Sequence, residues 1–339
     1  MSSAQSVSMP TPERIFDTIN AYQQSEALKA AIELEIFTAI GEGENEAAKI
    51  AKRCKCSERG ARILCDYLVT IGFLTKEQER YGLAPDAAMF LDGHSPAAMG
   101  SITNFLLSPA ITDPFRNFAA AVRKGGTAAS EHGTLEVENP AWVDFARSMA
   151  PMMAMPAELI AQALGSNSGK PWRVLDIAAG HGIFGIAIAK QNPNAQIYAA
   201  DWRNVLEVAR ENALRAGVID RYHTIPGDAF TTELGDRYDV VLLTNFLHHF
   251  DLPTCEKFLK RIHTAMAAGG RAVVLDFIPN EDRVSPAMPA RFALIMLGTT
   301  PSGDAYTLGE YKAMFQRAGF SSCEQVPMPI GEQVLMAQK

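Results

Sequence analysis

One stretch of the sequence decides the fold: Val174-Leu175-Asp176-Ile177-Ala178-Ala179-Gly180-His181-Gly182-Ile183-Phe184-Gly185. It starts as a short, mainly apolar strand, continues as a turn of small residues and opens an apolar helix. Small residues let the backbone approach a ligand, and the first N–H groups of a helix have no partner within it. The stretch therefore predicts a nucleotide or nucleoside site between a strand and a helix.

Downstream of this stretch, predicted strands alternate with predicted helices. We expect strands at 173–177, 196–200, 222–226, 239–244 and 271–277, and helices at 183–191, 205–216, 253–267 and 308–318. Such alternation is typical of a parallel, doubly wound α/β sheet. Two further apolar runs, 322–326 and 333–337, flank a Pro-Ile-Gly turn and predict a closing antiparallel hairpin.

The residues before 171 are mainly helical and form two parts. In the first, 1–100, the segments 47–54 and 57–71 predict a helix–turn–helix pair, with Ser57 capping the second helix. The runs 73–75 and 81–83 predict a β-hairpin, which completes a winged helix. The second part, 101–170, predicts a helical connector whose apolar side contributes to a substrate pocket.

A winged helix suggests either DNA binding or a packing and dimerisation module. The predicted recognition helix has only Arg59 and Arg62 as cations, against Glu58 and Asp66. The formal charge of the chain is -7, whereas binding to phosphates requires clustered Lys and Arg. We therefore expect a dimerisation module and no nucleic-acid partner.

Composition also bears on location and on metals. The first ten residues are polar, and the longest apolar runs fall far short of the roughly 20 residues that a membrane span needs. We expect a cytoplasmic protein with no membrane partner. Five scattered cysteines predict no disulfide framework, and Cys54-Lys55-Cys56 lacks the second pair of a zinc site, so no metal is expected.

Two cofactors fit the glycine turn. Gly180, Gly182 and Gly185 satisfy the Gly-x-Gly-x-x-Gly pattern of dinucleotide sites, with Asp201 about 20 residues on. Asp176 favours a different ligand, because a lone buried carboxylate is costly and a sulfonium ligand with an amino group would offset that cost. Asp228, which follows the third strand together with an aromatic residue, suits an adenine.

With these residues in place, the chain closely resembles the class I S-adenosylmethionine-dependent methyltransferases. The closest resemblance is to small-molecule O-methyltransferases that join an N-terminal winged-helix dimerisation domain to a Rossmann-like catalytic domain. It covers nearly the whole chain and rests on 176–182, Asp201-Trp202, 227–230, 245–250 and the Gly269-Gly270 turn. The family loop is usually richer in glycine than 176–182 is here.

The resemblance implies a Rossmann-like seven-stranded α/β catalytic domain at 171–339, a homodimer and S-adenosyl-L-methionine as cofactor. Asp201 would bind both ribose hydroxyls, Asp228 the adenine amino group, and the turn from Gly180 to Gly182 the methionine part. The implied cofactor-binding residues are Asp176, Ala178, Gly180, Gly182, Asp201, Trp202, Asp228, Ala229, Phe230 and Asn245.

A histidine pair follows the fourth predicted strand, where ligands of such sheets bind. Plant members of the resembled family have a general-base histidine here, and alignment through Cys255 implies that His248 is the base. Asp276 matches an acidic residue that positions it, and His249 is expected at the substrate. A second acidic residue of the family is replaced by Ala305, which keeps C-methylation of an activated carbon open as an alternative.

The proton balance favours a phenol or enol as acceptor. Moving a proton from a phenol to histidine is uphill by roughly 5 kcal/mol, and from an ordinary alcohol by more than double that. The substrate-lining residues implied besides His249 are Phe145, Met149, Met152, Phe292, Met296 and Thr300. Such an apolar lining points to a small aromatic or polyketide-like acceptor. A ligand-sensing winged-helix regulator and an NAD-dependent oxidoreductase are the alternatives from other classes.

Overall fold

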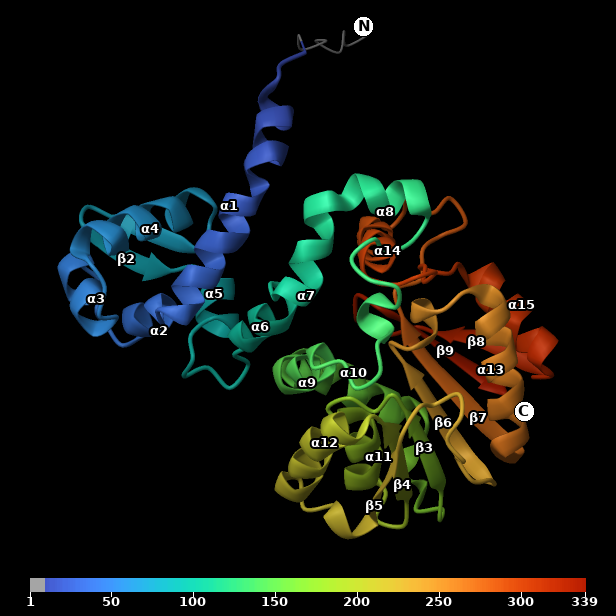
Figure 1. Cartoon of the computed structure of the whole chain (residues 1–339). Helices are drawn as coiled ribbons and strands as arrows, with labels where there is room; N and C mark the ends of the chain where they lie inside the picture. Colours follow the sequence, from blue (N-terminus) through green and yellow to red (C-terminus); the bar gives the residue numbers. More distant parts are fainter. Residues whose placement is uncertain (1–9) are drawn as a thin grey trace, which may run out of the picture. The chain divides into compact units, whose positions relative to one another are not determined.

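The computed structural model describes residues 10–339 and divides after Thr103 into two compact units (Figure 1). Residues 1–9, which belong to the polar N-terminal run behind the expectation of a cytoplasmic protein, lie outside the described part. Among the described residues, no helix combines the length and the apolar character that a bilayer span requires.

The first unit contains the predicted helix–turn–helix pair and hairpin. Ser57 caps the second helix of the pair, because its Oγ accepts the N–H of Gly60 at 3.0 Å. The two strands are antiparallel, with Leu74 opposite Leu83. The elements of this unit are α1 (Glu13–Glu33), α2 (Ile36–Gly41), α3 (Ala47–Arg53), α4 (Glu58–Thr70), β1 (Leu74–Glu77), β2 (Arg80–Leu83), α5 (Pro85–Phe90) and the 3-10 turn η1 (Gly100–Ile102).

Two of the cations near α4, Arg62 and Lys76, are already engaged. Arg62 pairs with Asp66 at 3.0 Å, and Lys76 of the hairpin reaches the same carboxylate at 2.7 Å. The opposite face of α4 buries Ala61, Cys65 and Leu68 in the core of the unit. The helix therefore offers little free positive charge for a phosphate backbone.

The second unit is built on a seven-stranded mixed sheet with the order β5-β4-β3-β6-β7-β9-β8. The five strands from β5 to β7 are parallel, and β8 and β9 form an antiparallel hairpin, both as predicted. The strand β9 also pairs antiparallel with β7. The strands are β3 (Arg173–Ile177), β4 (Gln196–Asp201), β5 (Tyr222–Pro226), β6 (Tyr238–Thr244), β7 (Met266–Asp276), β8 (Ser322–Val326) and β9 (Gln333–Gln338).

The start of β7 differs from the prediction. The strand begins at Met266, so the expected turn at Gly269-Gly270 is an irregularity within it, where the register against β6 shifts. Gly269 has φ +73°, and a Cβ on Gly270 would lie 2.9 Å from the carbonyl oxygen of Tyr238. The glycines are therefore needed for the close approach of two strands.

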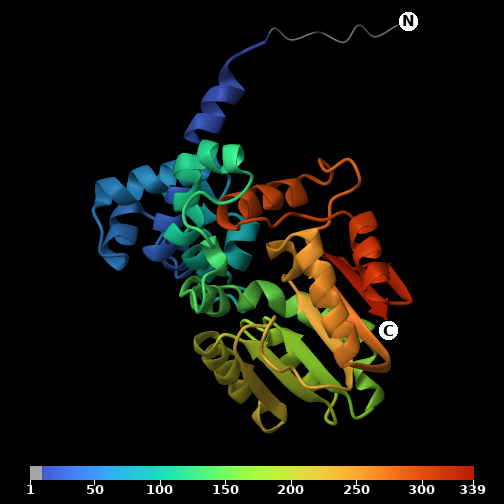
Figure 2. The same ribbon diagram turned by 45° about the vertical axis from the view of Figure 1, so that its right-hand side comes forward.

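Helices cover both faces of the sheet (Figures 1 and 2). Side chains of α10, α11 and α12 share one apolar cluster with the sheet, and those of α13 and α15 share another. The helices that involve this unit are α6 (Thr103–Leu106), α7 (Pro109–Thr112), α8 (Phe118–Lys124), α9 (Ala141–Ser148), α10 (Ala150–Ala163), α11 (Ile183–Gln191), α12 (Arg203–Arg215), α13 (Leu252–Ala265), α14 (Ala287–Thr299) and α15 (Leu308–Ala318).

Short 3-10 turns connect these elements: η2 (Asp113–Asn117), η3 (Gly133–Leu135), η4 (Ser166–Ser168), η5 (Ile219–Arg221) and η6 (Leu247–His249). The strand order reverses between β3 and β6: the chain adds β4 and β5 on one side of β3 and then places β6 and β7 on its other side. In such sheets ligands bind outside the carboxyl ends of the strands at this switch point.

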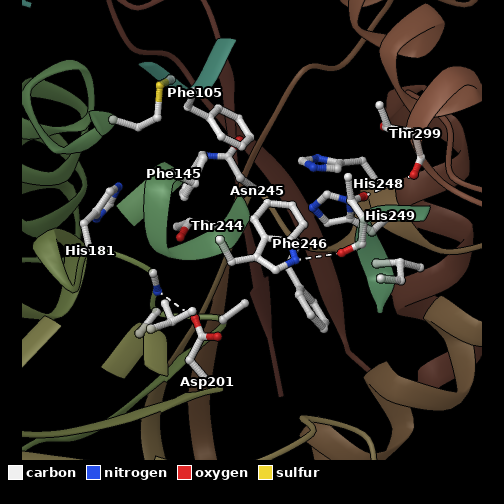
Figure 3. Close-up of a pocket in the computed structure, with 18 of the residues that line it drawn as sticks. Phe105, Phe145, His181, Asp201, Thr244, Asn245, Phe246, His248, His249 and Thr299 are labelled. Atoms are coloured by element: carbon white, nitrogen blue, oxygen red, sulfur yellow. Dashed lines mark hydrogen bonds between the residues drawn. The ribbon is translucent and has the colours of Figure 1, made fainter. Parts of the chain in front are cut away.

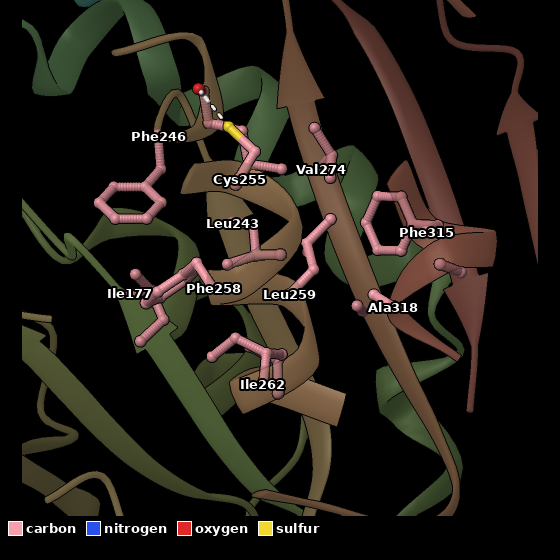
Figure 4. Packing of buried hydrophobic residues seen from close by; sticks show 14 of the residues in the cluster. Ile177, Leu243, Phe246, Cys255, Phe258, Leu259, Ile262, Val274, Phe315 and Ala318 are labelled. Carbon is pink, nitrogen blue, oxygen red and sulfur yellow. Dashed lines mark hydrogen bonds between the residues drawn. The ribbon is translucent and has the colours of Figure 1, made fainter. Parts of the chain in front are cut away.

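The packing of α13 fixes the histidine segment that precedes it. Phe258 and Leu259 lie against Ile177 and Leu243 of the sheet (Figure 4). At the start of the helix, the buried Cys255 thiol donates to the carbonyl oxygen of Leu247 at 3.2 Å. The turn η6 is therefore tied to the apolar core beneath it.

Candidate active site

A cavity of about 490 Å³ lies at the carboxyl ends of the parallel strands, within the size range of small-molecule sites. The segments 178–181, 200–202, 227–230 and 244–250 form its strand side, and residues of α9, α10 and α14 form the opposite walls. Figure 3 shows His181 and Asp201 on one side of this pocket and His248 and His249 on the other. Fifteen of the nineteen predicted site residues line it: Ala178, Gly180, Asp201, Trp202, Asp228, Ala229, Phe230, Asn245, Phe145, Met149, Met152, His248, His249, Phe292 and Met296.

Asp201 at the end of β4 holds the turn after β3 in place. Its Oδ2 accepts the N–H of Gly180 at 2.8 Å, and its Oδ1 accepts the N–H of Trp202 at 2.6 Å. Burial raises the pKa of Asp201 to about 6, although both N–H bonds oppose the shift. Asp228, at the end of β5, accepts the N–H of Phe230 at 2.8 Å.

Two residues at strand ends adopt left-handed backbone conformations without being glycine. Ala178 follows β3 with φ +49°, and Asn245 follows β6 with φ +52°. A left-handed alanine costs roughly 1–2 kcal/mol, and such strain gathers at functional sites. Ala178 thus adopts a left-handed conformation that glycine, the more usual residue in the loop of this family, takes without strain.

Three buried polar atoms of the pocket lining have no hydrogen-bond partner among the described residues: His181 Nε2, Asn245 Oδ1 and His249 Nδ1. The Nδ1 of His181 accepts the N–H of Ile183 at 3.2 Å, and burial lowers the pKa of His181 to about 4. His181 is therefore neutral with its proton on Nε2. A buried polar atom left unpaired costs about 1–3 kcal/mol, so these atoms fit a polar ligand with both donors and acceptors.

Asp176 and Gly182 do not line the cavity. The Asp176 side chain points to the α11 face, where its Oδ2 accepts the N–H of Gly185 at 3.2 Å. Burial raises the pKa of this fully buried carboxyl to about 8. Gly182 has φ +74°, and a Cβ there would lie 2.5 Å from the hydroxyl of Tyr222. Both residues therefore support the backbone of the turn and do not face the cavity.

His248 is held by a buried carboxylate. Its Nδ1 lies 2.7 Å from Oδ1 of Asp276, which also accepts the N–H of Phe277 at 2.7 Å. The hydroxyl of Tyr311 donates to Oδ2 of Asp276 at 2.6 Å. The tautomer that carries its proton on Nδ1 lets His248 donate to Oδ1 of this carboxylate. In that tautomer Nε2 carries the lone pair, and it has no hydrogen-bond partner among the described residues, whereas Asp276 lies behind the lining.

The turn that carries Ala305 restrains the backbone of His248 rather than its ring. The N–H of Asp304 donates to the His248 carbonyl oxygen at 3.0 Å, and a Cβ on Gly303 would lie 2.3 Å from the same oxygen. The Asp304 carboxylate pairs with Arg283 at 3.3 Å. Asp304 therefore does not replace the missing acidic residue.

His249 packs beside His248 with ring centroids 4.3 Å apart, and its ring meets Trp142 edge to face at 5.2 Å. Burial and the neighbouring His248 lower the pKa of His249 well below its usual value. His249 therefore stays neutral. Among the described residues, no three His, Cys, Asp or Glu side chains gather as a metal-binding group.

Thr300 is the fourth predicted residue that does not line the cavity. Its hydroxyl donates to the carbonyl oxygen of Met296 at 2.7 Å and accepts the N–H of Gly303 at 2.9 Å. It closes the end of α14, where the helical spacing from Met296 had suggested a place in the wall.

Several lining residues were not predicted. Trp142 lies three positions before Phe145 on the same helix, so helical spacing could have found it. Phe105 comes from a short segment with no periodic pattern, and only the fold brings it to Phe145, at 5.1 Å. The others include Ile111, Thr134, Met153, His181, Phe184, Phe246, Phe277, Met288, Arg291, Ile295 and Thr299.

Comparison with known proteins shows the family to which the chain belongs. Residues 144–321, more than half of the chain, match the O-methyltransferase domain family, and residues 16–93 match the O-methyltransferase dimerisation domain. The chain belongs to the S-adenosylmethionine-dependent O-methyltransferase family. This membership confirms the predicted fold, enzyme class and cofactor, and it decides between the two cofactors that fitted the glycine turn.

Relatives and solved structures of O-methyltransferases match almost end to end. The tetracenomycin polyketide synthesis 8-O-methyl transferase of Streptomyces glaucescens is 26% identical, over 91% of each chain. The 3-hydroxy-5-methyl-1-naphthoate 3-O-methyltransferase of Streptomyces sahachiroi is 25% identical, over 93% of this chain and 91% of the relative. The crystal structure of a candidate O-methyltransferase from Nostoc punctiforme is 55% identical, with a TM-score of 0.95 over 98% of this chain and 100% of the other.

Proposed function

We propose that this enzyme transfers a methyl group to a phenol or enol hydroxyl of a small aromatic or polyketide-like molecule. The observation that carries the proposal is His248: its Nδ1 lies 2.7 Å from a buried carboxylate, and the residue lines an apolar cavity where its Nε2 has no partner among the described residues. Deprotonation of a hydroxyl at that atom is the step the arrangement supports.

The strand-end residues are suited to hold the cofactor. Asp201 would bind the ribose hydroxyls, Asp228 the adenine amino group, and the turn around Gly180 the methionine part. The unpaired Nε2–H of His181 is a donor for the methionine carboxylate. S-adenosylmethionine, when bound, supplies a methyl group on a positively charged sulfur that a nucleophilic oxygen can attack.

Side chains of the enzyme accept the proton that the acceptor hydroxyl loses. As the acceptor oxygen reacts, its proton passes to Nε2 of His248. The imidazolium that forms is stabilised by Asp276, which Tyr311 and the Phe277 N–H hold in place. The uphill transfer of roughly 5 kcal/mol from a phenol is offset by positioning against an activated methyl group.

The acceptor class follows from the lining and from the relatives. Phe145, Met149, Met152, Phe292 and Met296 make an apolar wall with flexible thioethers, which suits a planar ring system. The two Streptomyces relatives are named for a polyketide and for a hydroxynaphthoate. Both names support an aromatic hydroxyl as acceptor.

We also propose a homodimer, with 1–100 as dimerisation domain, 101–170 as a helical connector contributing to the pocket and 171–339 as catalytic domain. Support comes from the match of 16–93 to the dimerisation domain. It also comes from α1, which exposes Ile15, Phe16, Ile19 and Tyr22 at helical spacing. Light scattering on the purified chain should give twice the monomer mass, and a monomeric mass would contradict the proposal.

The function is tested with S-adenosylmethionine carrying a ¹³C methyl group and a panel of naphthols, hydroxynaphthoates and enolic polyketide analogues. The carbon shift of the product methyl group separates O-methylation from C-methylation. We expect an O-methyl product, and a His248→Gln variant that binds S-adenosylhomocysteine normally but is nearly inactive. A C-methyl product alone, or no transfer to any phenol or enol by cofactor-binding protein, would overturn the proposal.

A further inference from the structure

The side of α14 that faces the pocket carries one charged residue, Arg291, among apolar neighbours. Six residues of this helix line the cavity at helical spacing: Met288, Arg291, Phe292, Ile295, Met296 and Thr299. Five of them are apolar or a threonine. Arg291 is the single charged residue between Ala287 and Thr299, and it lies on the side that faces the cavity.

The Arg291 guanidinium has no carboxylate partner among the described residues. The neighbouring Arg283 is engaged by Asp304 and Glu310, whereas no ion pair or hydrogen bond engages Arg291. Among the described residues it is also the one Lys or Arg side chain in the cavity lining. Arg291 is exposed to solvent and also belongs to the lining of an apolar cavity. It is therefore a cation at the border of the cavity, within reach of both water and a ligand.

The acidic groups of the lining are committed elsewhere. Asp201 and Asp228 stand at the ends of β4 and β5 and accept backbone N–H groups there. The cavity therefore has carboxylates on the strand side proposed to hold the cofactor and a single cation on the wall proposed to hold the acceptor.

Arg291 is also placed with respect to the proposed base. The next residue, Phe292, meets the His248 ring edge to face at 4.6 Å and stacks on Phe277 at 4.2 Å. Arg291 and Phe292 line the same cavity, so an aromatic acceptor that lies along these rings with its hydroxyl at His248 shares the cavity with Arg291. A guanidinium binds a planar carboxylate through two parallel hydrogen bonds.

We propose that the acceptor carries a carboxylate in addition to its reacting hydroxyl, and that Arg291 binds this carboxylate. The inference rests on the proposed function, because it takes the α14 wall as the acceptor side. It narrows the acceptor class from aromatic hydroxyl compounds to aromatic hydroxy acids.

The test compares one acid with its uncharged counterpart. The full-length protein, saturated with S-adenosylhomocysteine, is titrated by calorimetry with 3-hydroxy-1-naphthoic acid and with the methyl ester of that acid. The variants are Arg291→Gln, which removes the charge, and Arg291→Lys, which keeps the charge but cannot form the two parallel hydrogen bonds of a guanidinium. Arg210→Gln is the matched control, because Arg210 is an exposed arginine of α12 outside the cavity lining.

We expect the wild type to bind the acid at least about tenfold more tightly than the ester, which is about 1.4 kcal/mol. Arg291→Gln should abolish that preference by weakening the acid alone, Arg291→Lys should keep part of it, and Arg210→Gln should behave as wild type. Equal affinities for acid and ester in the wild type, equal losses for both in Arg291→Gln, or binding of neither compound would overturn the proposal.

The two proposals fail in distinguishable ways. An enzyme that methylates neutral naphthols but has no preference for the acid contradicts the role of Arg291 and leaves the proposed function standing. A protein that binds S-adenosylhomocysteine and methylates no phenol or enol contradicts the proposed function itself.

Discussion

The hydrogen bond from Tyr311 to Asp276 offers a sharp test of how the proposed base is held. Tyr311→Phe removes one hydroxyl from a buried site and leaves the ring in place. The hydroxyl donates to Oδ2 of Asp276 at 2.6 Å, and both side chains are almost completely buried. Because Tyr311 touches neither the cavity nor His248, any effect on catalysis must pass through the carboxylate.

The size of the effect follows from the burial and the charge of the pair. A hydrogen bond to a charged group contributes about 1.5–3 kcal/mol. In a unit of this size a loss of that magnitude lowers Tm by about 3–12 °C. A base contributes about 100-fold or more to the rate, and Asp276 keeps the Phe277 N–H as a second restraint. We therefore expect kcat to fall by about tenfold, with unchanged affinity for S-adenosylhomocysteine.

A double-mutant cycle separates positioning from general destabilisation. If Tyr311 acts through His248, adding Tyr311→Phe to His248→Gln should lower kcat no further. Tyr238→Phe is the control, because its buried hydroxyl donates to the Leu234 carbonyl oxygen at the other end of β6. It should lower Tm and leave kcat alone.

A second readout needs no acceptor. The Nδ1 proton of His248, bonded to a carboxylate, should give a downfield proton resonance that disappears in His248→Gln. We expect Tyr311→Phe to shift or broaden this resonance and Tyr238→Phe to leave it in place. An unchanged resonance together with an additive loss of kcat in the double variant would refute the reasoning.

Three further predictions concern single groups. His248→Gln should lower kcat by about 100-fold or more while the calorimetric Kd for S-adenosylhomocysteine changes less than about twofold; a smaller loss of rate would exclude His248 as the base. Burial raises the pKa of Asp176 from 3.8 to about 8, so the folded state keeps a proton that the unfolded state releases above about pH 4. The free energy of unfolding should therefore fall as pH rises from about 4 to 8 in cofactor-free protein, and Asp176→Asn should flatten that fall in thermal scans; parallel curves would contradict the assignment. Tyr222→Phe removes a buried hydroxyl that has no partner among the described residues and should stabilise the protein by about 1 kcal/mol, whereas a lower Tm would show that the hydroxyl is satisfied.

The sequence predicts the elements of the catalytic unit well where apolar periodicity is continuous. The strand, turn and helix around residues 173–191 are found as predicted, because each depends on contacts between neighbours in the chain. The start of β7 was misplaced because Met266-Ala-Ala-Gly-Gly has the composition of a break. Pairing with β6 overrides that local signal, and the glycines permit the close approach.

The site residues also divide into those that local sequence patterns predict and those that only the fold reveals. Residues at strand ends, such as Asp201 and Asn245, were predictable because parallel strands end at one edge of the sheet. Asp176 was placed in the site by its unusual charge, but its side chain points to the α11 face. Tyr311 and Arg291 could not be found as site residues: one looks like the core residue of an amphipathic helix, the other like a solvated arginine.

The absence of a second acidic residue at Ala305 had kept C-methylation open as an alternative. The net charge of the groups around His248 shows whether a second carboxylate is needed there. In the proposed proton transfer, His248 becomes positive beside the Asp276 carboxylate, so the charges of the buried pair cancel. A second buried carboxylate would leave a net negative charge in a site with little water, which is costly unless further donors satisfy it. Here the restraints on His248 come instead from uncharged groups, namely the Tyr311 hydroxyl acting on Asp276 and the N–H of Asp304 acting on the His248 carbonyl oxygen. Under the proposed mechanism one carboxylate is therefore enough to orient the ring and to stabilise the imidazolium, and the loss of the other gives no reason to prefer a reaction that needs no base.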